Sequence, residues 1–85
     1  MKPYHILLTK EAVKDVRKLT PRLREKLKAM LVNHLALDPF SGKKLAGDLD
    51  GFYSLRLTYQ DRIVYTIDET SGTVIIHRAR THYGD

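Results

Sequence analysis

Hydrophobic residues in the first half of the chain follow a helical period. A short apolar stretch over residues 4–8 predicts a strand, and apolar residues then recur every three or four positions over residues 9–19. The same spacing resumes after Thr20-Pro21, a pair typical of a helix start, and continues to about Leu37. Asp38-Pro39 ends this second helix. The first half therefore predicts a strand followed by two amphipathic helices that meet at a tight corner.

The second half of the chain changes to the period of a strand. Residues 40–51 are polar and rich in glycine, so we expect a loop with one short strand near Lys44-Leu45. Apolar and polar residues alternate over residues 53–58, and two further strands are expected over residues 62–67 and 73–80. Their connections are short, which favours antiparallel hairpins. The predicted fold is α+β with two layers: an N-terminal strand, a two-helix hairpin, and an antiparallel β-meander that the helices cover on one face.

The composition is that of one small domain over residues 1–85. Hydrophobic residues make up 42% of the chain and charged residues 29%, which is too apolar for intrinsic disorder. The chain contains no cysteine, which excludes disulfides, thiolate metal sites and thiol nucleophiles. Because no apolar run is long enough for a membrane span or a signal peptide, we expect a cytoplasmic protein without a membrane partner.

Positive charge is concentrated in the predicted helices. The chain has 15 Lys and Arg against 10 Asp and Glu, a net charge of +5, and residues 9–37 alone carry this excess. A basic surface of this kind favours polyanions or acidic partners. The alternative is a helix surface that is merely solvated.

Strand parity predicts a pair of arginines on the face that the helices leave open. If the apolar residues within 53–57 point toward the helices, Arg56 points away. A register that pairs Thr58 with Arg62 then brings Arg62 to the same face. Two arginines held close together by a sheet indicate an anionic ligand, although two ordinary exposed strand arginines would look the same in the sequence.

The C-terminal stretch combines residue types that suit phosphodiester chemistry without a metal. Arg78, Arg80 and His82 share one strand face by parity, and Tyr83 follows them. Arginine stabilises charge that develops on phosphate, histidine exchanges protons near neutral pH, and tyrosine stacks on a base or donates a proton. The competing interpretation is a basic tail whose last aromatic ring packs on the core. The spacing of the histidines and glycines predicts neither a metal site nor a nucleotide-binding loop, so we expect no cofactor.

Four segments of the chain resemble, in combination, the YoeB (Txe) branch of the RelE superfamily of bacterial toxins. They are Asp38–Gly42, Gly51–Arg56, Asp61–Tyr65 and Ala79–Tyr83. The resemblance implies a RelE-like fold and a type II toxin that is a ribosome-dependent, metal-independent endoribonuclease. Such an mRNA interferase promotes attack of the RNA 2′-hydroxyl on the neighbouring phosphate and so inhibits translation. The implied partners are mRNA, the A site of the small ribosomal subunit and a cognate antitoxin, in a homodimer or a toxin–antitoxin hetero-oligomer.

The resemblance also implies roles for individual residues. Arg62 matches the arginine that stabilises the transition state, and His82 and Tyr83 match the terminal His-Tyr pair of the family. In this scheme His82 is a general acid or base, and Tyr83 orients the substrate base or assists proton transfer. Arg56 and Arg80 match positions that bind phosphate.

One departure from the family concerns the general base. The YoeB branch carries a glutamate in the loop that precedes its Gly-Phe-Trp motif, whereas residues 42–47 of this chain contain no acidic residue. Lys43 or Lys44 would then bind RNA or take the place of the glutamate.

Two other functions compete with RNA cleavage. A ParE-like toxin on the same fold would inhibit DNA gyrase by binding, and the fold alone does not separate the two. The combination of arginines with a histidine and a tyrosine favours the nuclease, because a protein that only binds needs no proton donor there. A non-catalytic RNA-binding module is the third alternative, and the few exposed aromatic residues expected beyond Tyr59 and Tyr83 argue against it.

Overall fold

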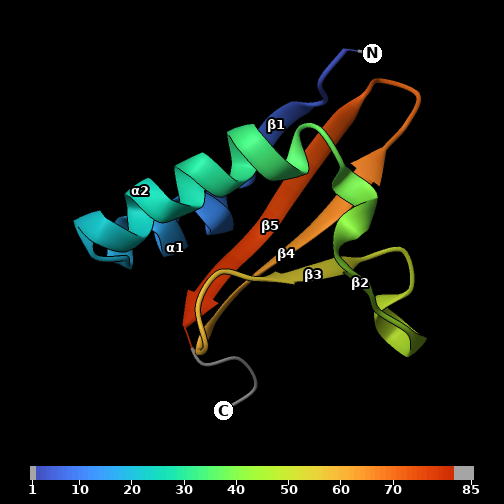
Figure 1. Cartoon of the computed structure of the whole chain (residues 1–85). Coiled ribbons are helices and arrows are strands. Elements are labelled where there is room, and N and C mark those ends of the chain that lie inside the picture. Colours follow the sequence, from blue (N-terminus) through green and yellow to red (C-terminus); the bar gives the residue numbers. More distant parts are fainter. Residues whose placement is uncertain (1, 82–85) are drawn as a thin grey trace.

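The computed structural model describes residues 2–81, with side chains as far as residue 79, and it has the predicted order of elements (Figure 1). The strands and helices are β1 (His5–Leu8), α1 (Lys10–Lys18), α2 (Pro21–Met30), β2 (Lys43–Lys44), β3 (Tyr53–Arg56), β4 (Asp61–Asp68) and β5 (Thr73–Thr81). A π-helical turn continues α2 over Leu31–Leu35, and short 3-10 turns, Pro39–Ser41 and Gly47–Leu49, lie on either side of β2. None of the described helices is long and apolar enough to cross a membrane.

Threonine side chains start both helices. The Thr9 hydroxyl accepts a hydrogen bond from the Ala12 main-chain nitrogen at 3.1 Å, and the Thr20 hydroxyl accepts one from Leu23 at 3.2 Å. Each bond satisfies a donor in the first turn that has no partner within the helix. Pro21 occupies the first position of α2, where its missing N–H costs nothing. These caps explain how two short helices form on either side of a tight corner.

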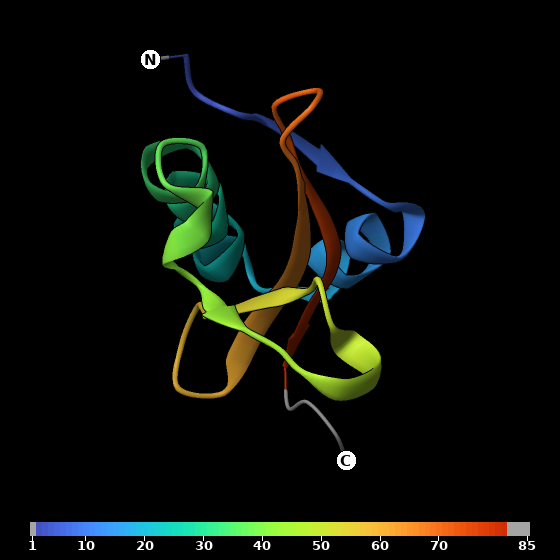
Figure 2. The same ribbon diagram turned by 90° about the vertical axis from the view of Figure 1, so that its right-hand side faces the viewer.

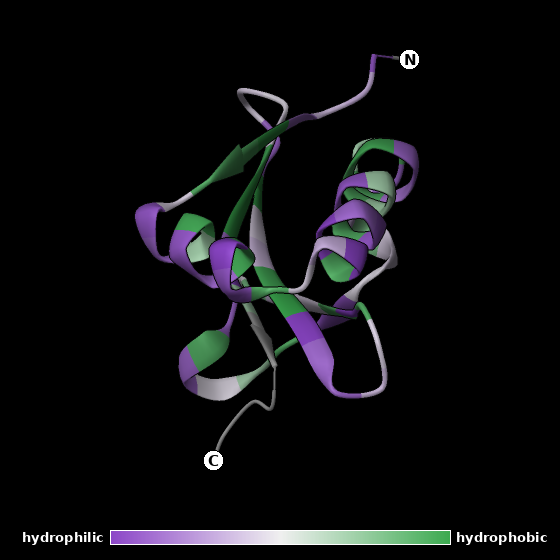
Figure 3. Ribbon diagram, turned by 90° about the vertical axis from the view of Figure 1, so that its left-hand side faces the viewer, coloured by the Kyte–Doolittle hydropathy of each residue, from purple (hydrophilic) through white to green (hydrophobic). Residues whose placement is uncertain are grey.

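The five strands form one sheet in the order β1-β5-β4-β3-β2. β1 runs parallel to β5, and every other pair is antiparallel. Figures 2 and 3 view the molecule from opposite sides and show both helices nearly end-on, with α2 on one side of β4 and β5 and α1 on the other; β2 and β3 cross in front in Figure 2. We refer to the face that carries Arg56 and Arg62 as the open face.

The register of the β3–β4 hairpin differs by two residues from the sequence prediction. Arg62 lies opposite Arg56, not opposite Thr58. The cause is the loop, in which the main-chain nitrogens of Leu57 and Thr58 both donate to the Asp61 carbonyl, at 2.8 and 3.2 Å, and thereby end the ladder early. A shift of two leaves each side chain on its predicted face, and it brings the two arginines directly opposite one another.

The core lies between the helices and the sheet. Its largest fully buried side chains are Leu35, Ile63, Tyr65, Val74 and Ile76. Burial of each such side chain contributes roughly 1.5–3 kcal/mol relative to exposure, so the two layers are held mainly by apolar contact. The core fixes the central strands, and these carry the residues of the open face.

Candidate functional site

Three arginines lie at the same level on three adjacent strands. Arg56 of β3 is opposite Arg62 of β4, which in turn is opposite Arg80 of β5. Neighbouring strands are about 4.8 Å apart, so the register concentrates positive charge in one row across the sheet. Arg56 is exposed and Arg62 is half-buried, whereas only the main chain of Arg80 is described. Like charges on adjacent strands repel one another, and a bound anion would relieve that repulsion.

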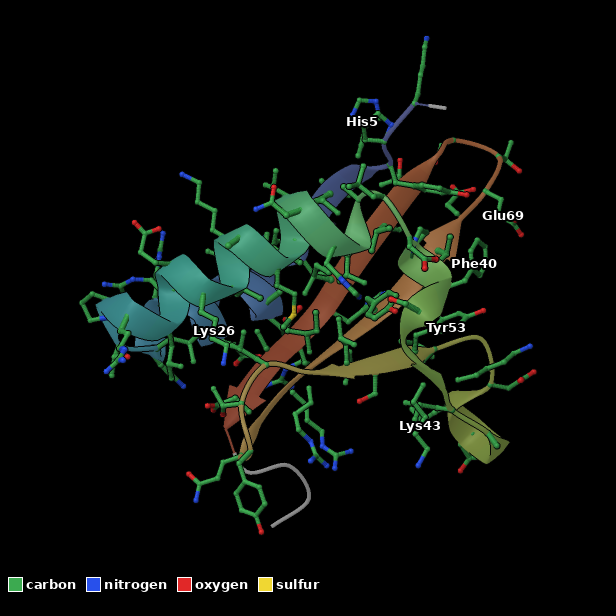
Figure 4. All side chains as sticks on the ribbon, viewed as in Figure 1. His5, Lys26, Phe40, Lys43, Tyr53 and Glu69 are labelled. Carbon is green, nitrogen blue, oxygen red and sulfur yellow. The ribbon has the colours of Figure 1, made fainter. Side chains whose placement is uncertain are left out.

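A hollow of about 230 Å³ opens beside this row. Its lining consists of Lys43, Ser54, Leu55, Arg56 and Arg62. Three of these residues are cationic and none is acidic, so the hollow suits a phosphate or a carboxylate. Figure 4 shows Lys43 pointing away from the helices.

The two lysines predicted as site residues, Lys43 and Lys44, lie on opposite faces of the sheet. Lys43 pairs with Ser54, two positions from Arg56, and therefore shares its face of the sheet. Lys44 pairs with Tyr53 and is not among the residues that line the hollow. Strand alternation thus brings Lys43 together with the arginines and sends Lys44 to the other side.

The buried hydroxyl of Tyr65 holds the segment that leads into Lys43. It donates a hydrogen bond of 2.7 Å to the Pro39 carbonyl, and burial raises the pKa of Tyr65 to about 12, so the proton stays on the oxygen. Gly42 packs directly over this hydroxyl: a Cβ added to Gly42 would lie 2.1 Å from the Tyr65 oxygen and 3.0 Å from the Ser54 carbonyl oxygen. The position next to Lys43 therefore accepts only glycine in this geometry.

Aromatic rings support the same segment from the core side. Tyr53 stacks on Tyr65 with ring centroids 5.5 Å apart, and Phe40 meets Tyr53 edge-on at 6.1 Å (Figure 4). Offset and edge-to-face pairs of this kind add to the stabilisation from buried area. Neither Gly42 nor Tyr65 was a sequence candidate, because nothing in the periodicity reveals that the two residues touch.

Arg78, which the sequence grouped with the phosphate-binding residues, is engaged in the fold. Its Nε donates to Asp15 Oδ2 at 2.8 Å and its Nη2 to Asp15 Oδ1 at 3.3 Å. The buried Asp15 carboxylate also accepts from the Ala79 main-chain nitrogen at 3.1 Å. This contact ties α1 to β5, and sequence reasoning missed it because Asp15 looks like any acidic helix residue.

None of the described histidines lines the hollow. His77 shares a hydrogen bond of 2.9 Å with the Thr66 hydroxyl, lies against the Phe52 ring at 5.0 Å, and has its pKa lowered by burial. His34 pairs with Ser41. Within residues 2–81 no cluster of His, Cys, Asp and Glu could hold a metal. The predicted catalytic residues His82 and Tyr83 lie outside the described residues.

The open face is also less polar than predicted. Ser54 and Val64 alternate with the arginines on it, and both are buried. A ligand can therefore reach the open face only at the end of the sheet where Arg56 and Arg62 lie, not along the whole face as strand parity predicted. This end can bind an anion, and its cations can stabilise negative charge that develops on that anion.

Comparison with known proteins gives concordant results. A family model of YoeB-like toxins of bacterial type II toxin–antitoxin systems matches residues 9–83. The chain is 35% identical to Toxin RelE of Mycobacterium tuberculosis over 80 residues, which cover 92% of this chain and 81% of that protein. It is 37% identical to Toxin YoeB of Streptomyces coelicolor over 71 residues, 79% of this chain and 76% of the other.

The fold has a close counterpart among solved structures. A chain in the crystal structure of the toxin–antitoxin complex RelBE2 from Mycobacterium tuberculosis superposes with a TM-score of 0.89 at 32% sequence identity. The match covers 99% of this chain and 97% of that chain. The similarity therefore extends over the whole domain, including both helices and the strands that carry the arginine row.

Proposed function

The chain belongs to the YoeB-like toxins of bacterial type II toxin–antitoxin systems, within the RelE superfamily, and on that premise we propose that it is a ribosome-dependent endoribonuclease that cleaves mRNA. The observation that carries the proposal is the hollow in which Lys43, Arg56 and Arg62 meet without an acidic neighbour in its lining. A phosphodiester of single-stranded RNA is the anion that this family membership suggests for it.

The proposed reaction needs no metal. The 2′-oxygen of one nucleotide attacks the adjacent phosphorus, the bond from phosphorus to the 5′-oxygen breaks, and a 2′,3′-cyclic phosphate and a 5′-hydroxyl result. A base takes the proton of the 2′-hydroxyl, and an acid gives a proton to the leaving 5′-oxygen. Negative charge builds up on the phosphoryl oxygens in between, which is where cationic donors accelerate the reaction.

Each residue then has a proposed role. Arg62, half-buried in the row, stabilises the charge on the phosphoryl oxygens, and Arg56 and Arg80 bind the flanking phosphates. Lys43 takes the position of the absent glutamate, either as the base or as a further phosphate ligand. Its place on the arginine face supports it over Lys44. His82 and Tyr83 are proposed as the acid–base residue and the residue that orients the substrate base.

A cognate antitoxin is the expected protein partner, since the structural counterpart is itself part of a toxin–antitoxin complex. An acidic antitoxin segment would neutralise the arginine row and exclude RNA by competition. Because the proposed substrate is mRNA on the ribosome, we expect the protein to act in the cytoplasm.

The test is translation in a cell-free extract to which the protein is added, followed by mapping of the mRNA ends. We expect cleavage at the codon in the ribosomal A site, and no cleavage with the Arg62→Ala variant as the matched control. Arrested translation with intact mRNA would refute the proposal. Inhibited DNA supercoiling by gyrase, with intact mRNA, would instead support the ParE-like alternative.

A further inference from the structure

Tyr59 is an aromatic side chain that the fold does not use. It lies in the loop between β3 and β4 and is 87% exposed, whereas the next most exposed large hydrophobic residue, Leu37, is 64% exposed. Tyr53 and Tyr65, by contrast, stack on one another in the sheet. Within residues 2–79, Tyr59 has neither a ring contact nor a hydrogen bond from its side chain. A ring this exposed adds little to stability, and its whole face is available to pack against a ligand.

The loop that carries Tyr59 is held rigidly. The Thr58 hydroxyl accepts hydrogen bonds from the main-chain nitrogens of Gln60 and Asp61, at 3.2 and 3.0 Å. The same hydroxyl donates to Asp61 Oδ2 at 2.5 Å, and the Asp61 side chain is only 5% exposed. Tyr59 sits between these bonded residues, so little backbone entropy is lost when a ligand packs on its ring.

The loop also directly adjoins the arginine row. Arg56 precedes Tyr59 by three residues and Arg62 follows it by three, and these two arginines face one another across the hairpin. At about 3.3 Å per residue, the loop tip lies within roughly 10 Å of the row. That is the span of one nucleotide from its phosphate to the far edge of its base. Asp61, the only acidic residue among residues 57–61 of this described loop, is buried and bonded to Thr58, so its charge is shielded from RNA.

We propose that Tyr59 is the stacking platform for a base of single-stranded RNA whose phosphate lies on the arginine row. The inference rests on the proposed function in taking RNA as the ligand, and it adds a base-binding subsite to the phosphate site. Every base has a π-face, so the subsite holds the strand without selecting its sequence. Tyr59 contributes to binding and takes no part in proton transfer.

The test uses the absence of tryptophan from the chain. Tyr59→Trp introduces a single fluorophore at the subsite, and the probe is a hexanucleotide with 2′-O-methyl groups, which the proposed reaction cannot cleave. We expect this probe to quench the tryptophan fluorescence, and an abasic hexamer of equal charge to leave it unchanged. Leu7→Trp is the matched control, because Leu7 is 56% exposed on β1, at the far edge of the sheet from β3. It should show no quenching.

Affinity measurements complete the test. Tyr59→Ala should weaken binding of the base-containing hexamer about 5- to 100-fold and leave binding of the abasic hexamer unchanged, while Tyr59→Phe should bind as tightly as the wild type. Equal affinity of wild type and Tyr59→Ala for the base-containing probe would overturn the inference, as would the absence of any binding. Quenching by the hexamer together with intact mRNA in the translation assay would refute RNA cleavage alone and leave the subsite standing.

Discussion

Replacing Gly42 with alanine should destabilise the protein, and removing the Tyr65 hydroxyl should relieve much of that cost. The backbone of Gly42, at φ −73° and ψ 169°, suits alanine, which by itself would stabilise the fold by about 0.4–1 kcal/mol. The new Cβ, however, would lie 2.1 Å from the Tyr65 oxygen, so this rigid ring must move and its bond to the Pro39 carbonyl must break. Overpacking costs about 1–3 kcal/mol, and a buried carbonyl left without a donor costs about 1–3 kcal/mol more.

In the Tyr65→Phe background the clashing oxygen is gone. The nearest atoms to an alanine Cβ are then the ring Cζ and the Ser54 carbonyl oxygen, both 3.0 Å away, and a shift of a few tenths of an ångström accommodates them. Tyr65→Phe alone removes the buried hydrogen bond to the Pro39 carbonyl and should cost about 1–2 kcal/mol. The double variant should therefore be more stable than the sum of the single costs predicts, by at least about 1 kcal/mol.

Urea unfolding of the four proteins, followed by circular dichroism, measures this coupling. In thermal unfolding, 1 kcal/mol corresponds to about 4–8 °C for a domain of this size. Gly51→Ala is the control substitution: Gly51 has a φ of +92° and open space around its Cβ position, so its cost should be the same with and without the Tyr65 hydroxyl. Additive costs for Gly42→Ala and Tyr65→Phe would refute the contact described here.

Three further predictions concern the site and its surroundings. Lys43→Gln should slow single-turnover mRNA cleavage on programmed ribosomes far more than Lys44→Gln; rescue by Lys43→Arg would indicate phosphate binding, and failure of that rescue would indicate a base. Arg62→Ala should reduce the same rate about 10²–10³-fold without lowering the melting temperature, and His82→Gln should reduce it about 10²–10⁴-fold; near-wild-type cleavage by a folded variant would remove that residue from the mechanism. Burial lowers the pKa of His77 in the folded state, so as the pH falls the unfolded chain takes up a proton on His77 before the folded protein does. The free energy of unfolding is therefore highest above pH 6.5 and decreases as the pH drops below that value. Thermal unfolding from pH 7.5 to 5 should show this loss in the wild type and a smaller loss in His77→Gln, and parallel curves would contradict it.

Features that depend on local pattern could be predicted from the sequence. Thr20-Pro21 marks the start of α2 because a cap and a first-turn proline act within a few residues. Strand alternation brings Arg56 and Arg62 to one face because the side-chain period of two holds for any even register shift. The short strand was predicted near Lys44-Leu45 and lies at Lys43–Lys44, and this single-residue difference decides which lysine joins the arginines.

Features that depend on contacts between distant segments could not be predicted. The hydrogen bond between Tyr65 and Pro39 joins residues 26 positions apart, and the ion pair between Asp15 and Arg78 joins residues 63 apart. The residue type alone does not predict the partner in either case, since a buried tyrosine and a helical aspartate have many structural uses. The exact hairpin register depended on main-chain bonds to the Asp61 carbonyl, which no hydrophobic pattern encodes.

The contact between α1 and β5 has a consequence for how this chain meets other chains. β1 pairs with β5 only as far as Ile76, beyond which β5 would present free backbone groups to any passing strand. There the Thr9 hydroxyl donates to the His77 carbonyl at 3.2 Å, and the Asp15 carboxylate accepts from the Ala79 nitrogen. Side chains of α1 and of its N-cap residue thus occupy the backbone groups of β5 to which another strand would otherwise bond. Over residues 2–79 the outer side of β1 and the two-residue β2 are then the edges at which a strand from another molecule can add to the sheet. The position of α1 thereby prevents edge-to-edge aggregation through this part of β5, at the end of the molecule where the arginine row lies.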